Sequence, residues 1–260
     1  MPLVKRDIFG HIVLVKRLLI SVIGMLTFPS FSWLNKTKIE GTEHLENLPP
    51  TKILFVSNHQ TYFADVIAYL HVFCSVKWKF KNSISNPVYL LNPQINTSFI
   101  AAEETMKAGI LPKIFGYVGS VQVKRTWREA GKNINRQVNI NEFSAIEKAL
   151  QQGWVITFPQ GTTTPYAPGR RGTAHIIKQY KPIVIPVVIN GFRRAFDKKG
   201  MLLKKRGITF SIKFKPALDI NYDAPSDKIL EQIMFAIEQS DAFHPVYSAP
   251  VNELEVELKD

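Results

Sequence analysis

Residues 52–73, KILFVSNHQTYFADVIAYLHVF, contain the pattern that decides the expected fold. Residues 52–57 form a short apolar run, which is typical of a strand buried on both of its faces. Residues 64–73 carry apolar side chains at helical spacing, and the polar stretch 58–63 joins the two. A β–loop–α unit is therefore predicted, with its loop at the end of a strand, where α/β proteins place functional groups.

The same alternation continues along the rest of the chain. Further strands are predicted at residues 98–102, 120–123, 154–158, 183–189 and 208–214. Helices are predicted at residues 103–108, 141–152, 173–178 and 227–238. Pro186 interrupts one of the strand runs and indicates an edge strand or a bulge. The predicted fold is a single α/β domain in which helices flank a mixed sheet.

The N-terminal segment, residues 1–38, has a composition that suits a membrane surface. Its apolar run at residues 18–28 is shorter than the roughly 20 residues that cross a bilayer, and Pro29 is expected to end the helix. Basic residues precede the run: Lys5, Arg6, Lys16 and Arg17. These features predict a helix that lies in the membrane interface. The alternative is an amphipathic helix packed on the domain.

Composition also divides the chain. Residues 1–38 are predicted to be the docking segment, residues 39–240 the α/β domain and residues 241–260 a C-terminal tail. A polar stretch that ends in a double proline, residues 40–50, leads into the first buried strand. The single cysteine, Cys74, excludes an internal disulfide and a cysteine-based metal cluster, and it fits a reducing compartment.

The charge of the chain indicates an anionic partner. Its 33 Lys and Arg residues against 21 Asp and Glu residues give a net charge of +12 and a pI of 9.7. Such a surplus suits nucleic acid, an anionic membrane or an acidic carrier protein, and a solvated basic surface without a partner is the simpler alternative. Nucleic-acid binding rests on charge alone, because the sequence has no recognition-helix, zinc-finger or aromatic RNA-binding pattern.

His59 and Asp65 are the candidate catalytic pair. The imidazole of a histidine titrates near neutral pH, so it can take a proton from a hydroxyl that attacks a carbonyl. A carboxylate on the other ring nitrogen fixes the tautomer and stabilises the imidazolium. Residues six apart on one helix point in different directions, so contact requires His59 in the turn and Asp65 in the first helical turn. By itself, a histidine near an aspartate is more often structural.

Further polar residues follow other strands. Arg125 comes after residues 121–123, where an arginine can bind phosphate bidentately. Gly161 and Thr162 follow Phe158-Pro159-Gln160 and supply backbone and hydroxyl groups for an anion, although the stretch also reads as an ordinary turn. The pair Arg170–Arg171, between two glycines, can hold an anion or form a solvated turn.

The sequence offers little for other mechanisms. It contains no Gly-x-Ser-x-Gly turn for a serine nucleophile and no histidine–glutamate metal motif. Direct attack by a substrate hydroxyl, assisted by His59, requires neither a cofactor nor a metal.

Four blocks in order resemble the glycerolipid acyltransferase family, which includes the 1-acyl-sn-glycerol-3-phosphate acyltransferases. The blocks are NHQTYFAD at 58–65, GSVQVKR at 119–125, FPQGTT at 158–163 and VIPVV at 184–188. The resemblance covers roughly residues 39–214. It implies an α/β fold with N-terminal membrane-docking helices, in agreement with the pattern of the residues.

The resemblance also implies a reaction and a set of site residues. His59 would be the general base and Asp65 its orienting partner, and Arg125 would bind the phosphate of the acceptor. The substrate-binding set would comprise Asn58, Arg125, Gln160, Gly161, Thr162 and Arg171. An acyl group would pass from acyl-CoA or acyl-carrier protein to the hydroxyl of a lysolipid, most specifically 1-acyl-glycerol-3-phosphate. The protein would act with membrane lipids, peripherally on the cytoplasmic face.

Two departures from the family pattern affect these expectations. Five residues instead of four separate His59 from Asp65, and a bulge in the turn is expected to absorb the extra one. Gln160 and Thr163 stand where the family usually has glutamate and arginine. Because groups near the acceptor change, a lyso-aminolipid acceptor is an alternative to 1-acyl-glycerol-3-phosphate. A non-catalytic lipid-binding relative is the second alternative.

Overall fold

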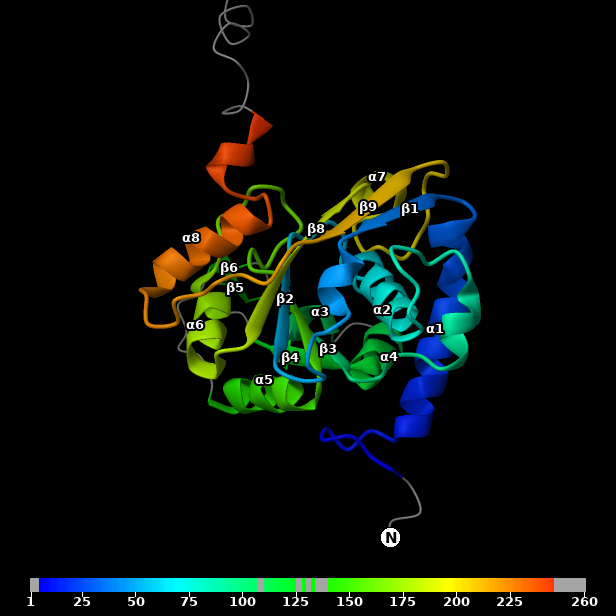
Figure 1. Cartoon of the computed structure of the whole chain (residues 1–260), viewed down its shortest axis with the longest axis horizontal. Helices are drawn as coiled ribbons and strands as arrows, with labels where there is room; N and C mark the ends of the chain where they lie inside the picture. The colour runs from blue at the N-terminus through cyan, green and yellow to red at the C-terminus, as the bar shows by residue number, and fades with distance from the viewer. Residues whose placement is uncertain (1–4, 107–109, 125–127, 130–131, 134–139, 246–260) are drawn as a thin grey trace, which may run out of the picture.

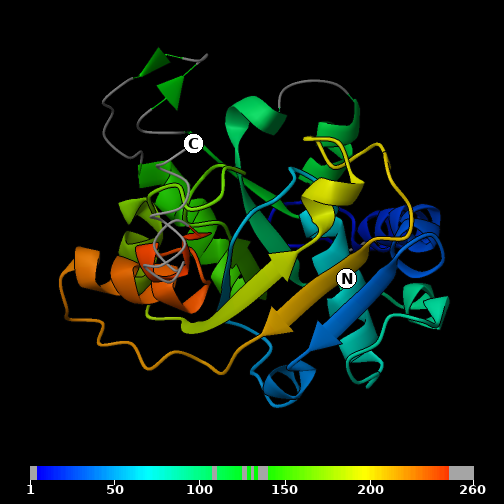
Figure 2. The same cartoon turned by 90° about the horizontal axis from the view of Figure 1, so that it is seen from above.

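A seven-stranded sheet forms the centre of the protein. The computed structural model describes residues 5–106, 110–124, 128–129, 132–133 and 140–245. The strand order is β1 (Lys36–Glu40), β9 (Thr209–Phe214), β8 (Ile183–Asn190), β2 (Ile53–Ser57), β7 (Trp154–Thr157), β3 (Thr97–Ala102) and β4 (Ser120–Val123). The strands from β8 to β4 are parallel, whereas β9 is antiparallel to β8 and pairs in parallel with β1 (Figure 2). The predicted mixed sheet is confirmed.

Helices cover both faces of this sheet (Figure 1). One layer contains α1 (Val13–Ser32), α2 (Ala64–Lys77) and α4 (Ile110–Val118), and the other contains α5 (Ile140–Gln152), α6 (Arg171–Tyr180) and α8 (Ser226–Ala236). Shorter elements are η1 (Thr42–Leu45), η2 (Pro87–Leu91), α3 (Glu103–Met106), β5 (Arg128–Glu129), β6 (Lys132–Asn133), α7 (Phe192–Ala195) and η3 (Asp241–Phe243). Residues 107–108 of a predicted helix lie outside the described residues.

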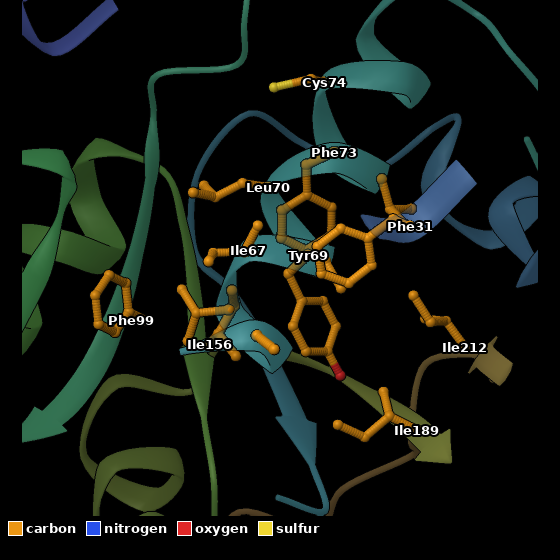
Figure 3. Packing of buried hydrophobic residues seen from close by; sticks show 14 of the residues in the cluster. Phe31, Ile67, Tyr69, Leu70, Phe73, Cys74, Phe99, Ile156, Ile189 and Ile212 are labelled. Atoms are coloured by element: carbon orange, nitrogen blue, oxygen red, sulfur yellow. The ribbon is translucent and has the colours of Figure 1, made fainter. Parts of the chain in front are cut away.

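The continuous apolar run of β2 follows from its position between these layers. Ile53 and Phe55 face the core beneath α1 and α2, while Leu54 and Val56 face the core beneath α5, α6 and α8. Twelve of the fourteen residues of α2 are buried, and its Tyr69 and Phe73 belong to the same hydrophobic cluster as Phe31 of α1 (Figure 3). This apolar packing fixes the N-terminal end of α2 next to the end of β2.

The prediction that Pro29 ends the N-terminal helix was wrong. Helix α1 continues to Ser32, and the Pro29 carbonyl accepts hydrogen bonds from the amides of Trp33 (3.0 Å) and Leu34 (2.8 Å). Proline removes only one helical hydrogen bond here, and burial of Phe28 and Phe31 holds the last turn in place. Helix α1 is long and apolar enough to cross a membrane, a property shared by signal sequences and core helices of soluble proteins. It is compatible with membrane association.

One face of α1 packs on the domain and the other is open. Lys16, predicted as part of a basic flank, is instead 1% exposed and forms an ion pair with Asp7 at 3.4 Å. The open face consists of apolar side chains that are 42–75% exposed: Leu14, Leu18, Val22, Met25 and Leu26. The division of the chain at residue 39 stays a prediction, and the sheet itself begins with β1 at Lys36.

The predicted strands agree with the structure to within one residue at each end, but Pro186 is at neither an edge nor a bulge. It lies inside β8, between β2 and β9. The Pro186 carbonyl faces the β9 side and accepts a hydrogen bond from the amide of Lys215, one residue beyond the end of β9. The backbone N and O atoms of one strand residue point to the same side, so the nitrogen of Pro186, which has no hydrogen, also faces the β9 side. Residue pairing between β8 and β9 begins only at Val187, so the proline costs the sheet no hydrogen bond within this ladder.

Acidification is expected to weaken the attachment of α1 through His71. This residue is 1% exposed and joins Thr27 of α1 (Nε2 to Oγ1, 3.0 Å) to Tyr89 of η2 (Nδ1 to Oη, 2.9 Å). Burial lowers the pKa of His71 from 6.5 to about 3, so below pH 6.5 the unfolded chain binds a proton that the folded chain does not. Stability present above pH 6.5 is then lost at about 1.4 kcal/mol per pH unit as the pH falls. Urea unfolding should show a weaker pH dependence in His71→Gln than in the wild type; equal dependence would contradict this assignment.

Candidate active site

Three adjacent parallel strands bring their carboxyl ends to one edge of the sheet. These are β8, β2 and β7, with β2 in the middle. The loop that follows β2 contains His59, and the loop that follows β7 begins with Phe158. Segments about 100 residues apart in the sequence therefore meet at this edge, as expected for a functional site of an α/β protein.

His59 and Asp65 are in contact. The Nδ1 atom of His59 lies 2.9 Å from Oδ2 of Asp65, whose side chain is fully buried in the first turn of α2. The same carboxylate accepts hydrogen bonds from the amides of Gln60 (2.6 Å) and Thr61 (3.1 Å) and from the Thr61 hydroxyl (2.7 Å). The five-residue spacing thus allows the contact, because the loop folds back around the carboxylate.

These contacts determine which ring nitrogen of His59 can act on a substrate. A carboxylate that already receives three N–H or O–H donors is an acceptor, so Nδ1 of His59 carries the proton and donates it to Asp65. The Nε2 atom then keeps its lone pair, and no described residue forms a hydrogen bond with it. The His59 side chain is 12% exposed. The arrangement can therefore accept a proton at Nε2.

The Phe158 ring stacks on the imidazole of His59. The ring centroids are 3.9 Å apart and the planes are inclined by 21°. This contact holds the ring from its face, while Asp65 holds it from its edge. Phe158 was quoted in the sequence blocks but was not among the predicted site residues, because no local pattern indicates a stacking partner on a neighbouring strand.

The loop between His59 and α2 is held by a second segment. The amides of Tyr62 and Phe63 donate to the carbonyls of Lys198 (3.2 Å) and Lys199 (2.9 Å). The amides of Gln60 and Thr61 bind Asp65, so the backbone N–H of each residue from 60 to 63 has a hydrogen-bond partner. Residues 198–199 are far away in the sequence, and nothing in the loop pattern predicted this support.

The dyad lies in a segment that matches a known protein family. A family model described as Acyltransferase matches residues 37–190, which contain β2, the dyad and the turn after β7. The chain belongs to the acyltransferase family. Comparison with curated proteins found no significant match. Among solved structures, the chain resembles PlsC, the 1-acyl-sn-glycerophosphate (LPA) acyltransferase from Thermotoga maritima, with 19% identity, a TM-score of 0.52 and coverage of 85% of this chain and 76% of PlsC. That likeness concerns the fold.

Three predicted substrate-binding residues of this acyltransferase have protein partners. The Asn58 amide pairs with both backbone groups of Ile189, at 2.8 Å each, and so ties the loop to β8. Gln160 is 1% exposed, and its Nε2 donates to the Ala167 carbonyl (3.0 Å) and to Oε1 of Gln239 (3.2 Å). Arg171 forms a bidentate ion pair with Asp227, at 2.7 and 2.8 Å, on the exposed side of α6. Substrate contacts by these side chains stay predictions.

Two other predicted substrate-binding residues, Gly161 and Thr162, lie in the turn after β7. Gly161 has a φ of +62° and donates its amide to the Phe158 carbonyl at 3.0 Å, so it closes the turn after β7. The Thr162 hydroxyl contacts the hydroxyl of Thr164 at 3.3 Å. Arg125 lies outside the described residues. Arg193, which no sequence pattern indicated, joins two loops: its guanidinium donates to the Thr163 carbonyl and its amide to Oε1 of Gln60 at 3.3 Å.

The described residues contain no group of three or more histidine, cysteine, aspartate and glutamate residues that can hold a metal ion.

The change Gln160→Glu, which restores the common family residue, is expected to destabilise this acyltransferase by roughly 1–3 kcal/mol. The Gln160 amide donates to two oxygens, and a buried glutamate would place a carboxylate against both of them. Chemical unfolding measures the change. The control is Gln179→Glu, because Gln179 is an exposed residue of α6 without an acidic residue three or four positions away in the sequence. Unchanged stability of Gln160→Glu would contradict this prediction and show that the turn accommodates a buried glutamate.

Gly200→Ala is expected to disturb the catalytic loop and to lower both stability and acyl transfer. A Cβ atom at Gly200 would lie 2.5 Å from the amide nitrogen of Ala64 and 2.7 Å from Oγ1 of Thr61. Its φ of +74° adds backbone strain of order 1 kcal/mol. Gly207→Ala is a matched control, because its φ is +73° and no atom lies within 4 Å of the added Cβ. Equal losses of activity in the two variants would show that backbone strain causes the loss and that contact with the catalytic loop does not.

Proposed function

We propose that this acyltransferase moves an acyl group from an acyl thioester to the hydroxyl of a lysolipid, with His59 as the general base. The observation that carries the proposal is the contact between His59 and Asp65 at 2.9 Å, which leaves Nε2 as the proton acceptor. The membership of the chain in the acyltransferase family supports the reaction class. A hydroxyl is a weak nucleophile, and a neighbouring imidazole is the usual means of activating it.

The reaction balances without an enzyme nucleophile. Nε2 of His59 takes the hydroxyl proton as the oxygen attacks the thioester carbonyl carbon, which gives a tetrahedral intermediate and an imidazolium. Asp65 stabilises the imidazolium through Nδ1. Collapse of the intermediate forms the ester, breaks the C–S bond and returns the proton from His59 to the leaving thiolate. Asp65 stays ionised throughout.

The proposed acceptor is 1-acyl-glycerol-3-phosphate, and a lyso-aminolipid is the alternative. A phosphate monoester suits a chain with a net charge of +12. The assignment of Arg125 to the acceptor phosphate rests on the sequence alone. The proposed donor is acyl-CoA or acyl-carrier protein, both of which are anionic. The buried amide of Gln160, in place of a glutamate, keeps the aminolipid alternative open.

We also propose that the protein acts peripherally on the cytoplasmic face of a membrane. The exposed apolar face of α1 provides the docking surface. Both substrates then reach the enzyme without leaving their compartments, because lysolipids lie in the membrane and acyl thioesters are cytoplasmic.

An acceptor panel tests the function. The purified protein is incubated with radiolabelled acyl-CoA or acyl-carrier protein and with lysophosphatidic acid, lysophosphatidylcholine or a lyso-aminolipid in detergent micelles. Labelled diacyl product with lysophosphatidic acid, and little with lysophosphatidylcholine, is the expected result. Product only with the lyso-aminolipid would identify that lipid as the acceptor and leave the proposed mechanism unchanged. No product with any acceptor would favour a lipid-binding relative without activity.

A further inference from the structure

A short hairpin follows α7 and lies against the catalytic loop. Within residues 196–207, called the basic hairpin below, Phe196 and Leu203 form an antiparallel bridge. Asp197 closes the tip: its carboxylate accepts the amides of Met201 (2.8 Å) and Leu202 (3.0 Å), and its own amide donates to the Leu202 carbonyl at 3.0 Å. The backbone of the tip is therefore held by its own hydrogen bonds.

The surface of this hairpin combines two properties that rarely occur together on a solvated loop. Met201 and Leu202, adjacent at the tip, are 48% and 68% exposed. Together with Arg193 and Arg194 of α7, which directly precede it, the hairpin has seven Lys and Arg residues and one Asp, so this stretch contributes +6 of the net +12. The exposed cations are Arg193, Arg194, Lys198, Lys199, Lys204, Lys205 and Arg206, and none forms an ion pair with a described residue.

The basic hairpin packs against the C-terminal end of α1. The Gly207 amide donates to the Leu34 carbonyl at 2.8 Å, and the rings of Phe196 and Phe31 are 5.6 Å apart. Both views show the hairpin beside the C-terminal end of α1 (Figures 1 and 2). Trp33, at this end, is 73% exposed. Exposed apolar side chains on a segment rich in cations, together with an exposed tryptophan where this segment meets α1, are the composition of a membrane interface.

We propose that the basic hairpin is a second membrane-docking element, which binds the surface of an anionic bilayer. Met201 and Leu202 enter the headgroup region, and the surrounding lysines and arginines contact anionic headgroups. An acidic protein would satisfy the cations but would not account for two adjacent apolar residues at the tip. The inference deepens the proposed function, because it names a contact with the membrane that lies next to the catalytic dyad.

The position of the hairpin gives this contact a consequence for the reaction. Its Lys198 and Lys199 carbonyls hold the amides of Tyr62 and Phe63, and Gly200 packs directly on Thr61. A hairpin seated in the headgroups therefore places the loop that contains His59 at the depth where a lysolipid exposes its hydroxyl. The apolar face of α1 alone provides attachment; the hairpin sets the orientation of the dyad.

A fluorescent probe at the tip tests the docking directly and requires no turnover. The chain has one cysteine, Cys74, which is buried, so Leu202→Cys provides one exposed thiol for an environment-sensitive label. Vesicles of phosphatidylcholine mixed equally with phosphatidylglycerol should shift the emission to the blue, and vesicles of phosphatidylcholine alone should not. The control is Phe235→Cys on α8, 58% exposed and on the far side of the sheet (Figure 1). No shift at residue 202 while the protein floats with the vesicles would overturn the proposal.

Reversing the charge of two lysines in the hairpin provides a second test. The double variant Lys204→Glu and Lys205→Glu should reduce the affinity for the mixed vesicles by roughly tenfold or more, since each basic residue near an anionic surface contributes to binding. The matched control is Lys148→Glu with Lys181→Glu, which changes the charge equally at exposed positions of α5 and the end of α6. Equal losses in the two doubles would overturn a specific role for the hairpin. So would unchanged vesicle binding with a raised KM for acyl-CoA, which would assign the cations to the donor.

Discussion

Replacing His59 with alanine is expected to lower the kcat of acyl transfer by roughly 10³-fold, within the 10²–10⁴ range for loss of a general base. The expected loss follows from the geometry, because Nε2 of His59 is the proposed proton acceptor at the end of β2. The fold should persist. Asp65 keeps its three other hydrogen bonds, and the amides of Tyr62 and Phe63 stay paired with Lys198 and Lys199, so the loop is held without the imidazole. Initial rates with labelled acyl thioester measure the effect.

The control for this variant is His175→Ala. His175 is an exposed histidine of α6, on the other layer of helices, and its removal should leave the rate unchanged. Thermal unfolding and vesicle binding of His59→Ala should match the wild type, which separates lost chemistry from lost folding. Wild-type turnover by His59→Ala would reject the mechanism, although the membership of the chain in the acyltransferase family would stand.

The parts of the fold that could be predicted are those determined by local pattern. The run at residues 53–57 is apolar on both faces, because the strand lies between two helical layers, and its polar end marks the loop. The contact between His59 and Asp65 was also predictable, since both residues lie in one short stretch. Strand β1 was not predicted, because in KTKIE only Ile39 is buried and an edge strand needs little apolar character.

The missed parts of the site depend on contacts between distant segments. The stacking of Phe158 on His59 requires β7 to lie next to β2, and the sequence gives no strand order. The basic hairpin reads as a polar loop, although its carbonyls support the catalytic loop. Asn58 and Gln160 were predicted to bind the substrate because the resemblance to the family implies it. Their substrate contacts stay predictions, while their amides pair with backbone groups of Ile189 and Ala167, which no local pattern reveals.

Asp65→Asn is expected to lower kcat by roughly 10²- to 10⁴-fold with little effect on KM. An asparagine has the same shape and can keep one oxygen toward the amides of Gln60 and Thr61, with its NH₂ group toward the Thr61 hydroxyl, which can accept. The neutral side chain, however, cannot stabilise the imidazolium that forms when His59 takes the proton. A loss of stability of about 1–3 kcal/mol is expected from the weaker hydrogen bonds and is measured by chemical unfolding.

A double-mutant cycle separates this positioning role from a merely structural one. If Asp65 acts through His59, then Asp65→Asn should cause no further loss of kcat in the His59→Ala background, because residues that act as a unit are not additive. If Asp65 only holds the loop, its substitution should lower the residual rate by the same factor in both backgrounds. The prediction is specific to this geometry, since the buried Asp65 carboxylate contacts the loop through three donors and the base through one. Additive losses would assign Asp65 to the loop and leave His59 without an orienting partner.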